Sequence, residues 1–273
     1  MKLFNKVLPP KKLTLKSGAT VYENRSHLIV ILPIFILFSI LAIKITGFNL
    51  NTLFTNANQF FVILAQIFKP NLDYLPQVIN PLKDTIKMSF LGSFLGAIVA
   101  MPFAFLASTN MVDNKVVNWI IRLLFSVLRT IPTLVNALIA TYIFGLGTLA
   151  GTIAIFIFSF SYVGKLTYEQ IETVDMGAFE AMISMGFTKV MAFIKGVVPQ
   201  ILPIYISTSL YNFEGNVRYA AILGYVGAGG LGLLLNENIG WRDYNSTGTI
   251  LLCLLVTVFV IENISSYFRN KLN

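Results

Sequence analysis

The chain has 273 residues, of which 56% are hydrophobic and only 12% are charged. Soluble domains carry about 25% charged residues, so this composition excludes an ordinary soluble protein and indicates a membrane protein. The net charge of +8 also occurs in nucleic-acid binders, but the basic residues flank apolar segments, and we expect no nucleic-acid partner. A single histidine, His27, and a single cysteine, Cys253, leave no disulfide framework, and we expect neither a metal site nor a cofactor.

Residues 1–26 form a basic tail ahead of the first apolar run. Six basic side chains oppose only one acidic side chain, Glu23; they are Lys2, Lys6, Lys11, Lys12, Lys16 and Arg25. The positive-inside rule therefore predicts that this tail is cytoplasmic. Residues 27–46 form the first predicted span, which is long and lacks a clean small-residue cleavage site, so we expect a retained anchor and not a signal peptide. An extracytoplasmic segment with a short interfacial helix is expected at residues 50–80.

The remaining chain predicts a polytopic, all-α bundle with about six membrane spans. Several apolar windows extend over about 18–22 residues, the length that a helix needs to cross a hydrocarbon core of about 30 Å. The five further spans are expected at residues 84–107, 132–147, 149–164, 202–222 and 246–266.

Two of these segments carry patterns that predict how they pack. Small residues recur every four positions on the second span, at Gly92, Gly96, Ala100 and Ala104, so a second helix can approach this face closely in lipid. The segment 116–130 places Arg122 and Arg129 on one face of a helix, and we expect it to lie at the membrane interface.

Residues 180–199, EAMISMGFTKVMAFIKGVVP, have the length and apolarity of a further span but contain Lys189 and Lys195. A charged residue near the bilayer centre costs about 2.5–3.5 kcal/mol, which disfavours a crossing here. Six spans also return Arg269 and Lys271 to the side of the basic N-terminus. We therefore expect a cytoplasmic loop at about 176–199 that contains a helix. Its apolar face either folds back on the bundle or docks on a partner, and the pattern alone leaves both open.

The register of this loop resembles the EAA loop of ABC-importer permeases. Glu180-Ala181-Met182 is followed by Gly186 and then by Pro199, as in the pattern E-A-A, three residues, G, nine residues, I-x-L-P. Met182 and Gly196 depart from that pattern. The resemblance implies that the loop is a coupling helix seated in a groove of a separate ATPase, with Gly186 allowing a tight bend and Glu180 pairing with a basic residue of the partner.

Four further segments are similar to phosphonate-transporter permeases. They are RTIPTLVNALI (129–139), GLGTLAG (145–151), VGKLTYEQIETVD (163–175) and YNFEGNVRYAAILGYVGAGGLG (211–232). The resemblance implies a type I ABC importer permease fold at residues 80–268, followed by a cytoplasmic tail at 269–273. It also implies a bacterial cell membrane location with both termini cytoplasmic.

The same resemblance implies the partners and the cargo. The partners are two ABC ATPase subunits, an extracytoplasmic substrate-binding protein and a second permease copy in a homodimer. The cargo is phosphonate or a related phosphorus oxyanion. Two alternatives stay open: a permease for another small solute such as methionine, and a non-transporting membrane scaffold or sensor that docks an ATPase.

Glu214 and Arg218 lie four residues apart inside the fifth predicted span. Ionisable residues at that depth pair with one another or face a cavity. Glu214 and Arg218 therefore form a simple intrahelical ion pair, or Arg218 additionally lines the pathway of an anion.

Two nucleotide-binding patterns fail on their context. Gly227, Gly229, Gly230 and Gly232 lie in GAGGLG, which fits G-x-G-x-x-G, but a dinucleotide site needs a preceding strand and this turn follows a membrane helix. We expect a closely packed turn at the external side that contributes to a gate. Gly164-Lys165 is followed by Leu166 where a phosphate-binding loop needs Ser or Thr. The chain is therefore not expected to be an enzyme, and ATP hydrolysis is expected on a separate subunit.

Overall fold

The computed structural model describes residues 11–14, 20–23 and 28–272, and the chain divides into two compact units between Val62 and Ile63. The first unit contains an antiparallel hairpin of β1 (Lys11–Thr14) and β2 (Thr20–Glu23), the helix α2 (Leu28–Thr46) and most of α3 (Leu50–Ile67). The hairpin is a departure from the all-helical prediction and lies inside the predicted basic tail. Helix α2 covers the first predicted span, and His27 lies outside the described residues.

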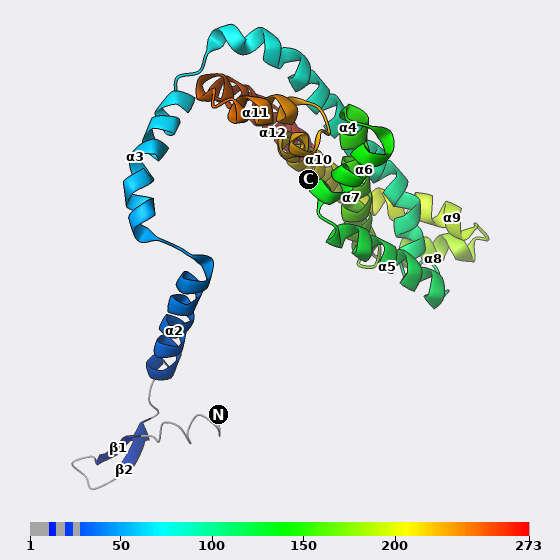
Figure 1. Ribbon diagram of the computed structural model, residues 1–273. Coiled ribbons are helices and arrows are strands. Elements are labelled where there is room, and N and C mark those ends of the chain that lie inside the picture. Colours follow the sequence, from blue (N-terminus) through cyan, green and yellow to red (C-terminus); the bar gives the residue numbers. More distant parts are fainter. Residues whose placement is uncertain (1–10, 15–19, 24–27, 273) are drawn as a thin grey trace. The chain divides into compact units, whose positions relative to one another are not determined.

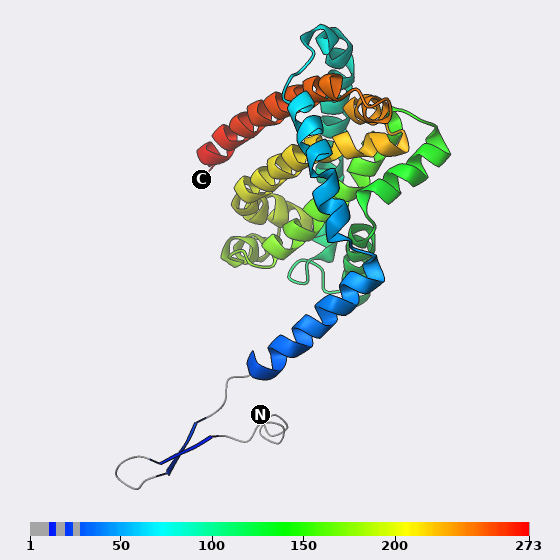
Figure 2. The same cartoon turned by 60° about the vertical axis from the view of Figure 1, so that its left-hand side comes forward.

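All regular secondary structure in the described residues of the second unit is helical. Its elements are η1 (Leu72–Tyr74), α4 (Leu75–Ala107), α5 (Lys115–Thr130), α6 (Thr133–Phe144), α7 (Thr148–Ile171), α8 (Gly177–Ser184), α9 (Lys189–Ala192), the π-helical turn η2 (Phe193–Val197), α10 (Val198–Leu223), η3 (Gly224–Val226), α11 (Leu231–Gly240) and α12 (Tyr244–Leu272). Helix α10 packs against α4, α7 and α12 (Figures 1 and 2). Helices α5, α8 and α9 lie at one end of this bundle, and α11 lies at the other (Figure 1).

Four continuous helical stretches of this unit are long and apolar enough to cross a membrane: 72–107, 148–171, 189–226 and 244–272. The predicted third span, residues 132–147, does not form one crossing helix. Helix α6 has 12 residues and rises about 18 Å, which is shorter than a hydrocarbon core of about 30 Å. It has the composition of a span only together with α5, from which it is bent by 91°. The break falls at Ile131-Pro132, where Ile131 is extended, as residues before proline prefer.

The helices extend beyond the predicted spans because hydropathy marks the part of a helix that lies in lipid and not its full length. Helix α7 continues to Ile171, and α12 continues to Leu272. Residues 269–272, predicted as a tail, therefore form the last turn of α12. Two elements were underestimated: the segment after the first span contains the 18-residue helix α3, and α11 occupies the connection that was expected to be a turn.

Small residues bring α4 and α7 into close contact, as their four-residue repeat predicts. A Cβ atom on Gly96 would lie 2.8 Å from the carbonyl oxygen of Phe156 and 2.8 Å from Cβ of Ser159. Ala100 and Ala104 continue this buried face of α4. The close approach of the two backbones forms the centre on which the other helices pack.

Candidate functional site

The loop predicted at 176–199 folds as a hairpin of the two short helices α8 and α9. Helix α8 ends in a Schellman motif, in which the Phe187 N–H donates to the Met182 carbonyl (3.1 Å) and the Gly186 N–H donates to the Ile183 carbonyl (2.9 Å). Gly186 has φ = +88°, and a Cβ atom there would meet nothing within 4 Å. Glycine is therefore needed for the backbone conformation of this turn and not for space.

The hairpin has an inner face that packs on the bundle and an outer face that is free. The buried inner residues are Phe179, Ala192, Phe193 and Val197, which join a core cluster with α4, α5 and α7. The exposed apolar residues are Ile183, Met185, Phe187, Val190, Met191 and Ile194. Met182 packs partly on the core, whereas Ala181 and Glu180 are exposed. Glu180 has no ion-pair partner within residues 28–272.

Pro199 lies in the first turn of α10, directly after a π-helical turn. Proline has no N–H and cannot donate to the carbonyl of Lys195, and the Val198 N–H reaches back five residues to the carbonyl of Phe193. Gly196 lies in this turn, where a Cβ atom would be 3.1 Å from the backbone nitrogen of Phe179. Gly196, which replaces the isoleucine of the EAA pattern, therefore has no side chain in the way and lets α8 approach the start of α10.

An ion pair that the sequence analysis missed fixes the bundle end above this hairpin. Glu172 pairs with Arg122 and accepts a hydrogen bond from the Thr109 N–H (2.8 Å), and Arg122 Nε donates to the Ala107 carbonyl (2.9 Å). Burial raises the pKa of Glu172, but the hydrogen bonds from Thr109 and the charge of Arg122 outweigh it, so the pKa lies below its ordinary 4.5. The carboxylate joins α4, α5 and α7.

The pair of Glu214 and Arg218 is part of a larger buried arrangement. Glu214 is 3% exposed and binds two guanidinium groups, that of Arg218 on its own helix and that of Arg269 on α12 (Nη1 to Oε2, 3.3 Å). Arg269 also donates to Ser265 Oγ (2.9 Å). One carboxylate shared by two guanidinium groups leaves this group of side chains with a net positive charge.

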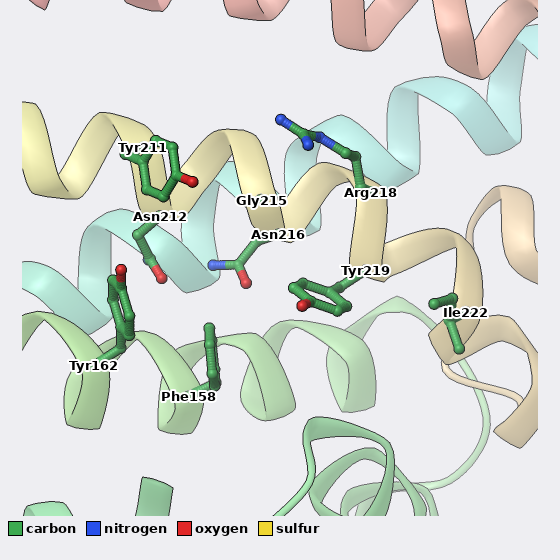
Figure 3. A pocket seen from close by; sticks show the side chains of 9 residues that line it. All are labelled: Phe158, Tyr162, Tyr211, Asn212, Gly215, Asn216, Arg218, Tyr219 and Ile222. Carbon is green, nitrogen blue, oxygen red and sulfur yellow. The ribbon is translucent and has the colours of Figure 1, made fainter. Parts of the chain in front are cut away.

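Beside this arrangement, α7 and α10 enclose a pocket of about 430 Å³ that the sequence analysis did not find. Its lining residues are Phe158, Tyr162, Tyr211, Asn212, Gly215, Asn216, Arg218, Tyr219 and Ile222. Figure 3 shows Asn212 and Asn216 pointing from α10 toward α7, while the guanidinium group of Arg218 points away from them. Two asparagines four residues apart in an apolar span were the available signal for this pocket.

The glycine-rich turn at 227–232 is packed against α4 and the start of α7. Gly227, Gly229 and Gly230 have φ values of 74°, 76° and 70°. The Gly147 N–H donates to the Gly227 carbonyl (2.9 Å), and the Leu231 N–H donates to Thr85 Oγ1 (2.7 Å). Gly232 lies directly against the backbone of α10. A 3₁₀ turn, η3, precedes the motif, so it lacks the strand of a dinucleotide site.

Comparison with known proteins decides the family. A family model described as the inner membrane component of binding-protein-dependent transport systems matches residues 92–272. The chain belongs to this family. As such a component with several membrane-length helices, it is a multi-pass inner membrane protein.

This inner membrane component has curated relatives among transport permeases. It is 33% identical over 211 residues to the phosphate-import permease protein PhnE of Mycolicibacterium smegmatis, a match that covers 77% of this chain but only 40% of that protein. It is 30% identical to the phosphite transport system permease protein PtxC of Stutzerimonas stutzeri, with 80% of this chain and 79% of that protein covered. The chain thus spans less than half of the first relative and most of the second.

Solved structures show the same fold. The inward-facing MetNI methionine ABC transporter gives a TM-score of 0.63 at 21% identity, with 72% of this chain and 96% of that chain covered. An amino acid ABC transporter crystallised with histidines gives a TM-score of 0.61 at 24% identity, with 73% and 96% covered.

Proposed function

We propose that the chain is the membrane-spanning permease subunit of an ATP-driven importer and forms the pathway for phosphonate or a related phosphorus oxyanion. The assignment of the cargo rests on one observation, the match to the phosphite permease over 79% of that protein's length. The phosphate-import permease, matched over part of its length, names a cargo of the same chemistry. Methionine is the alternative cargo, supported by a relative named as a D-methionine permease at 22% identity.

The proposed motor is a pair of ABC ATPase subunits that bind the outer face of the α8–α9 hairpin. Glu180, Ala181, Met182, Gly186 and Pro199 are the proposed coupling residues, and the exposed apolar side chains around Met185 supply the docking surface. The inner face of the hairpin is buried in the bundle, and α9 continues through η2 into α10. Closure of the ATPases would therefore move α10 and switch the bundle from inward-open to outward-open.

The remaining parts of the proposed importer follow from the same assignment. An extracytoplasmic binding protein delivers the cargo, a second copy of this chain completes the pathway, and both termini are cytoplasmic in a bacterial cell membrane. Gly227, Gly229, Gly230 and Gly232 form the proposed external gate, because their turn leads into α11, which lies at the end of the bundle opposite the hairpin. A scaffold that docks an ATPase without transport is the second candidate function.

Competition for uptake tests the cargo. Vesicles that contain the complete transporter are loaded with ATP and supplied with the cognate binding protein and labelled methylphosphonate. We expect unlabelled phosphite, phosphate or another phosphonate to compete and methionine not to compete. Competition by methionine alone would overturn the proposed cargo, and a correctly assembled complex that moves none of these compounds would favour the scaffold.

A further inference from the structure

A buried polar cluster between α4, α7 and α10 lies under the pocket described above. Asn216 Nδ2 donates to Ser93 Oγ (2.8 Å) and to Ser159 Oγ (2.9 Å), and Asn212 Nδ2 donates to the same Ser159 Oγ (2.8 Å). The four residues are between 0% and 4% exposed. Three helices thus direct amides and hydroxyls at one point beside the pocket.

The cluster is only half satisfied. The Oδ1 atoms of Asn212 and Asn216 are buried without a hydrogen-bond partner, and neither Ser93 nor Ser159 donates a hydrogen bond within residues 28–272. A buried carbonyl without a partner costs about 1–3 kcal/mol, and apolar surroundings in a membrane offer no water in compensation. Unpaired polar groups at this cost in a membrane helix indicate that the asparagine amides interact with a ligand in another state of the protein.

Rotation of each asparagine amide by a half-turn exchanges its carbonyl and NH₂ groups, so that the NH₂ group and not the carbonyl is left without a hydrogen-bond partner. The two carbonyls then accept from the hydroxyls of Ser93 and Ser159, since a serine hydroxyl can donate or accept. The two NH₂ groups of Asn212 and Asn216 are left with free protons beside the pocket. The same four side chains therefore present hydrogen-bond donors to an anion, without any change in the positions of the helices.

The charge around the pocket also favours an anion. None of the nine lining residues is acidic, and one of them, Arg218, has a side chain that is 53% exposed. Its guanidinium group pairs with Glu214, which Arg269 also binds, and Arg218 lines a second pocket together with Glu262 of α12. On α5, Arg129 lies over the ring of Tyr162, 5.7 Å from its centroid.

Aromatic side chains cover the amides in this conformation. Phe158 stacks on Tyr162 with ring centroids 5.7 Å apart and meets Tyr219 edge-on at 6.3 Å. Figure 3 shows these rings beside the two asparagines, between α7 and α10. Rotation of these side chains would uncover the polar cluster from the pocket side, and the phenol hydroxyls would add further donors.

We propose that Asn212 and Asn216 form a binding site for an oxyanion inside the membrane-spanning bundle, with Arg218 supplying positive charge at its rim. The inference rests on the proposed function and deepens it, since it assigns the residues that hold the cargo during passage. The site binds a tetrahedral phosphorus oxyanion through the amide donors that the rotated asparagines present.

The test compares Asn212→Asp and Asn216→Asp with the unaltered permease in vesicles that contain the ATPase and receive the binding protein loaded with methylphosphonate. A carboxylate keeps the size of the side chain and still accepts from the serines, but it repels an anion. We expect uptake per ATP hydrolysed to fall about tenfold or more while hydrolysis continues, because a hydrogen bond to a charged group is worth about 1.5–3 kcal/mol. Asn238→Asp is the matched control, since Asn238 is buried in α11 outside the pocket.

The possible outcomes distinguish failure of the proposed binding site from failure of the proposed importer function. Normal uptake per ATP by both assembled aspartate variants would overturn the binding site and leave the importer intact, as would an equal loss in Asn238→Asp. Absence of phosphorus-oxyanion uptake by the unaltered complex would overturn the proposed function itself. If an aspartate variant does not assemble, Asn212→Ser and Asn216→Ser replace it. They keep a hydroxyl for the serines and remove the amide donors, and the same tenfold fall is required of them.

Discussion

The Glu172 carboxylate joins three helices through one ion pair and its hydrogen bonds with Thr109. Its pKa lies below the ordinary 4.5, so the ionised form stabilises the fold above that value and the contribution is lost as the pH falls through the lower folded pKa. We expect Glu172→Gln to lower the unfolding free energy by about 1–2 kcal/mol at pH 7. Thermal unfolding of the purified chain measures it. The deficit should shrink toward pH 4, and an equal deficit at both pH values would contradict the assignment.

Glu214 is held by two arginines, so the loss of either one leaves it paired. Arg218→Gln and Arg269→Gln should each have a small effect, whereas the double variant leaves a buried carboxylate unpaired. Breaking a buried pair costs about 3–5 kcal/mol, so we expect the double variant to lose clearly more stability than the two single variants together. Adding Glu214→Gln should restore most of the loss. Melting temperatures of the four variants in detergent decide this, and strictly additive losses would contradict the shared carboxylate.

At the scale of the elements, the contact between α4 and α7 depends on Gly96. A methyl group there would lie 2.8 Å from a backbone oxygen of α7, so the helices must separate. We expect Gly96→Ala to reduce the unfolding free energy by about 1–3 kcal/mol, measured by chemical or thermal unfolding. Gly240→Ala is the control, since nothing lies within 4 Å of a Cβ atom at that site. A Gly96→Ala variant as stable as Gly240→Ala would show that the helices are not in close contact.

The outer face of the α8–α9 hairpin is the proposed seat of the ATPase. Met185 is 67% exposed, so Met185→Glu should leave the fold of the chain intact but place an unpaired charge in the contact. We expect the affinity for the ATPase, measured by titration in detergent, to fall about tenfold or more. Thr173→Glu adds the same charge to an exposed site in the α7–α8 connection and should retain binding. Equal affinities of the two variants would remove this face from the interface.

Hydropathy and charge spacing predicted most of the elements but not every boundary. The long spans and the hairpin at 176–199 follow from local signals, namely apolar length and the positions of Lys189 and Lys195. A bend at Ile131-Pro132 follows from the expected change there from an interfacial helix to a membrane span, but the angle of 91° and the short length of α6 are set by tertiary packing and were not predicted. Helix α11 was missed because its glycine-rich start reads as a turn.

The candidate site was predicted where the signal lies within a few residues and missed where it needs contacts across helices. The Glu214–Arg218 pair follows from spacing on one helix, but Arg269 reaches Glu214 from a position 55 residues later. Likewise Asn212 and Asn216 form a polar cluster only through hydrogen bonds to Ser93 and Ser159 on other helices. The periodicity of a single segment does not predict such side-chain contacts between helices that are distant in the sequence.

At the scale of the whole molecule, the helical bundle connects the α8–α9 hairpin at one end with the glycine-rich turn at the other. The hairpin continues through η2 into α10, and α10 carries Asn212, Asn216 and the Glu214 ion pairs before it reaches the glycine-rich turn. A displacement at the hairpin therefore passes along one helix to the proposed oxyanion site and then to the proposed external gate. This continuity is what an importer driven by a separate ATPase requires.

ATP-driven uptake into vesicles with each component omitted in turn tests the central claim most directly. Vesicles that contain this chain and its ATPase are loaded with ATP, and labelled methylphosphonate, phosphite or phosphate is added with the binding protein. The account predicts accumulation that needs the chain, the ATPase, ATP and the binding protein together. Failure of an assembled, ATP-hydrolysing complex to accumulate any phosphorus oxyanion, or accumulation that persists without the ATPase, would contradict it.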